Sequence, residues 1–74
     1  MANPLQDRFA ETLLEKIASD RHPSGTQMDM LESVASPRMQ AAFALHLMER
    51  IEAEPHPSIP MMHRVKRLVE GFGS

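Results

Sequence analysis

Large hydrophobic side chains recur every fourth position near the start of the chain, and this spacing places them on one face of a helix. Asn3 and Pro4 stand before this pattern as a helix cap and a first-position proline. Gln6 stands where a capping-box partner would reach back to the cap. Because Pro23 prevents a simple continuation, we expect a helix that ends near Ser19. Its inward-facing residues would be Leu5, Phe9, Leu13 and Ile17.

A shorter hydrophobic pattern follows Pro23 and predicts a second helix. Ser24 is the expected cap, and Gln27 stands three residues later, where it completes a capping box. The inward side of this helix would be formed by Met28, Leu31 and Val34. No stretch of the chain alternates between polar and apolar residues with period two, so we predict no strand.

The second half of the chain repeats this order of a long pattern, a proline-rich turn and a shorter pattern. Ser36 and Pro37 again provide a cap and a first-position proline. The long pattern is Met39, Phe43, Leu47 and Ile51, and the turn contains Pro55, Pro57 and Pro60 with Ser58 as the next cap. The last helix would turn Met62, Val65, Leu68 and Val69 inward and end at Gly71 and Gly73.

Aligning Leu5–Val34 with Met39–Leu68 at an offset of 34 residues gives ten identities in thirty positions without a gap. Chance would give roughly two identities, so the chain contains an internal repeat. We predict an all-α, compact four-helix domain made of two helix-turn-helix repeats related by a pseudo-twofold axis. It would be a single domain over residues 1–74, with repeat one at 3–35 and repeat two at 37–71.

The most regular element of the repeat is the turn His22-Pro23-Ser24, which is copied as His56-Pro57-Ser58. An acidic residue lies two positions before each His, and a Met follows each turn. This turn resembles that of small uncharacterised helical proteins of actinobacteria. The resemblance implies a helical fold over most of the chain and implies no activity. Tetratricopeptide repeats share the 34-residue period, but their Trp, Leu, Gly and Tyr positions have no counterpart here.

Composition and motifs narrow the class of function. The chain has 74 residues, no cysteine and a formal net charge of −2. It shows no glycine-rich phosphate loop, serine elbow or paired acid motif, so we predict that it is not an enzyme and needs no cofactor. The acidic balance makes nucleic acid an unfavoured partner. No signal peptide and no membrane-length apolar run is visible, and we expect a cytoplasmic protein without a membrane partner.

Two groups of residues suggest alternative functions. His22 and His56, with the nearby acids, could form a metal-linked sensor, but their role in shaping the turns is the favoured explanation. Arg64, Lys66 and Arg67 on the last helix could contact DNA in a small regulator, but a solvated basic face is favoured.

A third observation concerns positions where the repeats differ. Polar residues of repeat one are replaced in repeat two by apolar ones, and we predict a partner-binding face comprising Ala41, Leu45, Met48, Ile59 and Met61. An exposed apolar patch of this kind marks protein association. The alternative is that these side chains fill a gap in an imperfectly symmetric core. The leading hypothesis is therefore a protein–protein interaction module or small adaptor, whose partner is a second copy or a helix of another protein.

Overall fold

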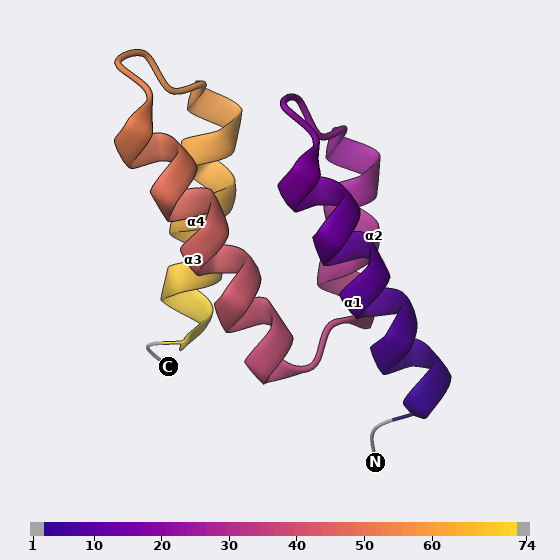
Figure 1. Cartoon of the computed structure of the whole chain (residues 1–74). Coiled ribbons are helices and arrows are strands. Elements are labelled where there is room, and N and C mark those ends of the chain that lie inside the picture. Colours follow the sequence, from indigo (N-terminus) through magenta and orange to yellow (C-terminus); the bar gives the residue numbers. More distant parts are fainter. Residues whose placement is uncertain (1–2, 73–74) are drawn as a thin grey trace. The chain divides into compact units, whose positions relative to one another are not determined.

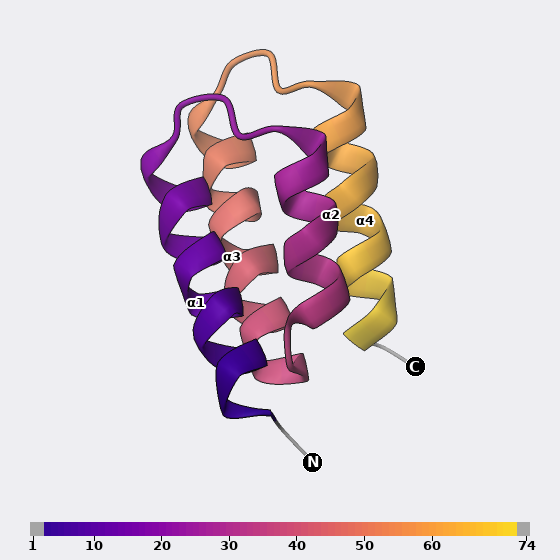
Figure 2. The same cartoon turned by 90° about the vertical axis from the view of Figure 1, so that its right-hand side faces the viewer.

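The computed structural model describes residues 3–72, and these residues form four helices and no strand (Figure 1). They are α1 (Pro4–Ser19), α2 (Gly25–Val34), α3 (Pro37–Ala53) and α4 (Ile59–Phe72). Figures 1 and 2 show α1 and α2 as one antiparallel hairpin and α3 and α4 as another. The predicted all-α class with two helix-turn-helix elements is confirmed.

Packing divides the chain into two compact units, one ending at Gln40 and the other beginning at Ala41. The boundary lies one turn inside α3. The two short helices begin 34 residues apart, as the repeat predicts, but the two long helices begin 33 residues apart. Relative to the 34-residue offset, α3 therefore starts one residue earlier in its repeat than α1 does. The single domain with pseudo-twofold packing of its repeats stays a prediction.

The helix starts follow the predicted caps. The Asn3 side-chain oxygen accepts a hydrogen bond from the Leu5 backbone N–H at 3.0 Å. Ser24 and Gln27 form the reciprocal capping box, with distances of 3.1 Å and 3.4 Å. The Ser58 hydroxyl accepts from the Met61 backbone N–H at 3.1 Å. Each bond satisfies a backbone donor that the first turn of a helix leaves without an intrahelical partner.

The two repeated glutamines act at the end of α2. The Gln6 side-chain amide donates to the Val34 carbonyl at 3.2 Å, so its predicted capping-box role is wrong. The Gln40 amide donates to the Ala35 carbonyl at 3.2 Å and to the Glu32 carbonyl at 3.4 Å. These bonds supply donors to backbone carbonyls that the end of a helix leaves without an intrahelical N–H partner. The last turn of α2 is therefore closed by side chains from both long helices.

The buried residues of the first hairpin come from a narrower face of α1 than the four-residue spacing suggests. Leu5 is 76% exposed and Phe9 is 46% exposed, so their predicted place in the core is wrong. For Leu5 the cause is geometric, because four residues advance a helix by about 400° and each step drifts by about 40°. Leu5 therefore lies about 120° away from Ile17 around the helix. This drift does not explain Phe9, since Phe43 at the matching position of repeat two is fully buried. The core of this hairpin is Ala10, Leu13, Ile17, Met28 and Leu31.

The second hairpin also departs from the predicted core. Its buried residues are Phe43, Ala44, Leu47 and Leu68, whereas Met62 and Val69 are exposed. Helix α4 continues through Gly71 to Phe72, so the predicted stop at Gly71 is wrong, and Gly73 lies outside the described residues. Gly71 does not have a positive φ, which a glycine that terminates a helix commonly adopts.

Candidate functional site: apolar faces of the second hairpin

Helix α3 carries three apolar side chains on its exposed side. Ala41, Leu45 and Met48 follow one another at spacings of four and three residues, which places them on one face. All three are exposed, and Leu45 retains 57% of its accessible surface. The structure therefore places this part of the predicted partner-binding face at the surface and not in the core. We call these three residues the α3 face.

Helix α4 contributes differently from the prediction. Ile59 is 64% exposed, but Met61 is half-buried and lies about 200° from Ile59 around the helix. Met61 thus does not share a face with Ile59, and its place in the partner-binding face stays a prediction. A second exposed row does include Ile59, and we call it the α4 face: Ile59, Met62, Lys66 and Val69.

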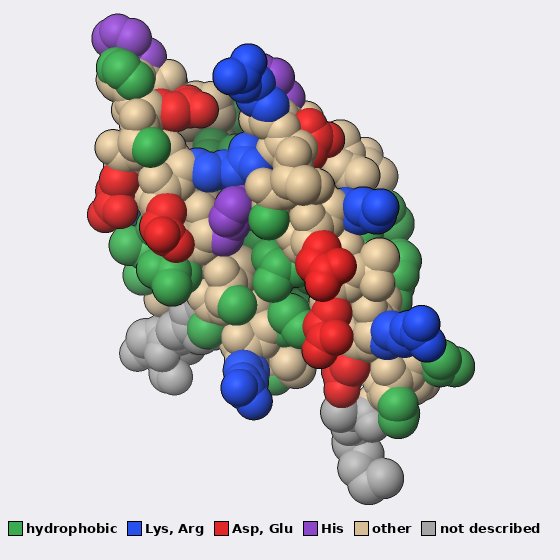
Figure 3. Space-filling view, viewed as in Figure 1, with side chains coloured by type: hydrophobic (Ala, Val, Ile, Leu, Met, Phe, Trp, Pro, Cys, Tyr) green, Lys and Arg blue, Asp and Glu red, His purple; other side chains and the backbone are tan. Residues whose placement is uncertain are grey.

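Sequence reasoning missed Met62 and Val69 because it assigned both to the core. The sequence does contain a pattern that indicates their exposure. Ile59, Met62, Lys66 and Val69 follow one another at intervals of three, four and three residues, which is the spacing of one face of a coiled-coil helix. A lysine within such a row indicates that the row reaches solvent. Figure 3 shows hydrophobic side chains gathered along the outer edge of the second hairpin, at the left of the view.

A shallow, open hollow of about 170 Å³ lies against α4 and is lined by Ile59, Met62, His63 and Lys66. Sites that enclose a small molecule commonly measure about 300–1,000 Å³ and bury most of the ligand. This hollow is smaller, and its lining is mostly apolar.

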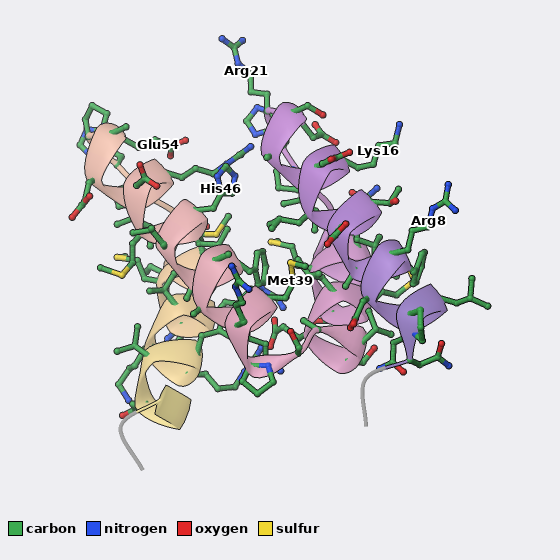
Figure 4. The ribbon with its side chains drawn as sticks, turned by 60° about the horizontal axis from the view of Figure 1, so that its bottom comes forward. Arg8, Lys16, Arg21, Met39, His46 and Glu54 are labelled. Carbon is green, nitrogen blue, oxygen red and sulfur yellow. The ribbon has the colours of Figure 1, made fainter. Side chains whose placement is uncertain are left out.

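His46 lies on α3 (Figure 4) and contacts Arg50 one turn later. The Arg50 Nε–H donates a hydrogen bond to His46 Nε2 at 3.0 Å. This bond requires the neutral imidazole, because a protonated ring has no acceptor nitrogen. Partial burial lowers the pKa of His46 from its ordinary 6.5, and the nearby Arg50 charge lowers it further, while Glu49 acts in the opposite direction. The hydrogen bond between Arg50 and His46 orients both side chains, and the neutral imidazole is its acceptor.

Two of the three basic residues of the DNA hypothesis share a side of α4. Arg64 and Arg67 are three residues apart and differ by about 60° around the helix, with Arg64 half-buried and Arg67 exposed. Lys66 lies about 200° from Arg64, and its ammonium forms an ion pair with Glu70 at 3.1 Å. The DNA-contacting role of these residues stays a prediction.

The histidine turns are explained by local structure. The Asp20 carboxylate accepts a hydrogen bond from the His22 backbone N–H at 3.0 Å, which shapes the turn before α2. His22 and His56 are both exposed. Among residues 3–72, no group of three or more His, Cys, Asp or Glu side chains is arranged to hold a metal ion. Figure 4 shows Arg21 extending from the same turn.

Comparison with protein-family models, curated proteins and solved structures found no match to this chain. Within the described range, no helix has both the length and the hydrophobicity that crossing a membrane requires.

Proposed function

We propose that this protein is a non-enzymatic interaction module that binds another polypeptide through its second hairpin. The observation that carries the proposal is the exposure of Leu45 within the α3 face, where Ala41 and Met48 lie beside it on the same helix. Contiguous apolar surface costs free energy in water, and its removal from water on association is favourable. The exposed Ile59 and Met62 of α4 extend the apolar surface of the same hairpin.

The composition of the two faces fits recognition of a helix. Met48 and Met62 have flexible, polarizable side chains that adapt to a partner surface. Leu45 and Ile59 are branched aliphatic side chains that lose less rotamer freedom than Met when a partner covers them. Apolar anchors spaced along a helix at three and four residues are typical of surfaces on which a second helix is laid.

The test compares two variants that add the same charge to exposed positions of the two long helices. Leu45→Glu places a carboxylate in the α3 face, whereas Thr12→Glu places one on α1. Both should retain the helical circular dichroism spectrum and thermal midpoint of the unsubstituted protein. Tagged protein would be isolated from its host, and co-purifying polypeptides would be quantified by mass spectrometry.

We expect the specific partners to be lost with Leu45→Glu and kept with Thr12→Glu. If the partners survive Leu45→Glu, association uses another surface and the proposal fails. If Leu45→Glu instead abolishes the helical spectrum, the side chain belongs to the core, and the proposal fails for that reason.

A further inference from the structure

The α3 face continues into oppositely charged residues at the two ends of its helix. Arg38, Leu45 and Glu52 are seven residues apart in turn, so each step covers two helical turns and returns to within about 20° of the same direction. All three side chains are exposed. The resulting row is positive at its start, apolar in its middle and negative at its end. Glu49, one turn before the end, is also exposed and adds to the negative charge.

The charges at both ends oppose the preference of the helix itself. Arg38 is the second residue of α3, and Glu52 is the last but one. The helix macrodipole favours acidic side chains in the first turn and basic side chains in the last turn. The two charges therefore do not serve the stability of α3, and their arrangement suggests a use outside the helix.

We propose that the partner of the α3 face is a second copy of this chain, with the two α3 helices antiparallel about a twofold axis at Leu45. This proposal rests on the proposed function, because it names the occupant of the same face. In this arrangement Arg38 of each copy meets the acidic end of the other, so two ion pairs flank the apolar centre. A parallel arrangement would instead place like charges together at both ends. By the same symmetry Met48 of each copy lies opposite Ala42 and beside Ala41 of the other, which is the complementary packing of large against small side chains.

The symmetry defines distances that can be tested. Residue 45 meets residue 45 at the axis, whereas the two copies of residue 52 lie on opposite sides of it. Fourteen residues separate Arg38 from Glu52, so these ends are about 21 Å apart along the helix. A single pair of helices buries less area than a standard interface, and we expect a weak dimer that forms in the micromolar range or above.

The first test is sedimentation equilibrium of the purified full chain at low salt from about 10 µM to about 1 mM, together with charge-reversed variants. Arg38→Glu and Glu52→Lys each create two like-charge contacts, so each should weaken the dimer roughly tenfold or more. The double variant restores attraction in the antiparallel dimer only, and its affinity should return to within about threefold of the original. Because both changes agree with the helix dipole, helical content should not fall.

The second test uses the absence of cysteine from the chain. Leu45→Cys should form a disulfide-linked dimer readily under mild oxidation, because the two residues meet at the axis. Glu52→Cys is the matched control on the same helix and should not, because its two copies are far apart. Rapid linkage through Glu52→Cys, or no rescue by the double charge variant, would overturn the antiparallel arrangement.

A chain that stays monomeric to about 1 mM, and whose Leu45→Cys variant does not become linked, would overturn self-association altogether. The proposed function would then be decided separately by the co-purification of partners with Leu45→Glu and Thr12→Glu, because that experiment does not depend on a dimer.

Discussion

Replacing Phe43 by alanine removes a phenyl ring that has no exposed surface, and Phe9 provides the matched position in the first repeat. Truncation of a fully buried Phe costs about 3–5 kcal/mol through lost burial and a residual cavity. For a chain of this length the whole free energy of unfolding is about 4–11 kcal/mol. Phe43→Ala should therefore remove a large share of the stability of the protein.

Phe9→Ala should be much milder, although the two residues are identical in the repeat. Phe9 keeps 46% of its surface in water, so roughly half of the transfer free energy of its ring is at stake, or about 1 kcal/mol. No sealed cavity forms, because the space opens to solvent. Urea unfolding followed by circular dichroism at the helical band, with the slope compared between variants, measures both changes. Equal losses, or a larger loss for Phe9→Ala, would refute this assignment of burial.

Two further predictions concern hydrogen-bonded side chains. Gln40→Ala should lower the free energy of unfolding by about 1–2 kcal/mol, because two carbonyls at the end of α2 lose their donor, whereas Gln6→Ala should cost less, since it frees only one exposed carbonyl. Because the pKa of His46 is lower in the folded than in the unfolded chain, its contribution to stability should be intact above about pH 6.5 and should fall as the pH drops from there toward the folded pKa. His46→Gln should flatten that part of a pH series of urea unfolding curves, and an unchanged slope would contradict the lowered pKa of His46.

The sequence predicts the helices well because their limits depend on nearby residues. Asn3, Ser24 and Ser58 each accept a hydrogen bond from a backbone N–H two or three residues later, so the cap can be recognised from a few letters. The end of α1 at Ser19 is likewise a local consequence of Pro23 and the turn before it.

Burial was harder to predict because it depends on the angular width of each contact face. Leu5 continues the four-residue spacing of the core, yet it lies about 120° from Ile17 and is exposed. Phe9 is half exposed, whereas Phe43 at the matching position of repeat two is fully buried. Gln6 stands at the position of a capping-box partner, but its side-chain amide instead donates a hydrogen bond to the Val34 carbonyl at the end of α2. Neither outcome is contained in the local pattern, because each depends on where a second helix lies.

The candidate site was likewise predicted only in part, because exposure depends on how each helix is rotated. Comparison of the repeats, in which Glu11 is replaced by Leu45 and Gly25 by Ile59, left open whether the new apolar residues are exposed or fill the core, and the structure has Leu45 and Ile59 exposed. The same comparison included Met61 and omitted Met62. These neighbours differ by about 100° around α4, and only the rotation of the helix against its surroundings decides which one reaches solvent.

The short connection between α2 and α3 has a consequence for protease sensitivity. Met39 donates its backbone N–H to the Ser36 hydroxyl, Gln40 donates its own to the Ser36 carbonyl, and the Gln40 side chain holds the Ala35 carbonyl. A protease must draw several residues into an extended form, which would break all of these bonds. The turn at residues 20–24 is longer, and Arg21 is exposed in it, whereas the turn at residues 54–58 contains no Lys or Arg. Trypsin, which cleaves after Lys and Arg, should therefore open the tip of the first hairpin at Arg21 first and leave α2 joined to α3.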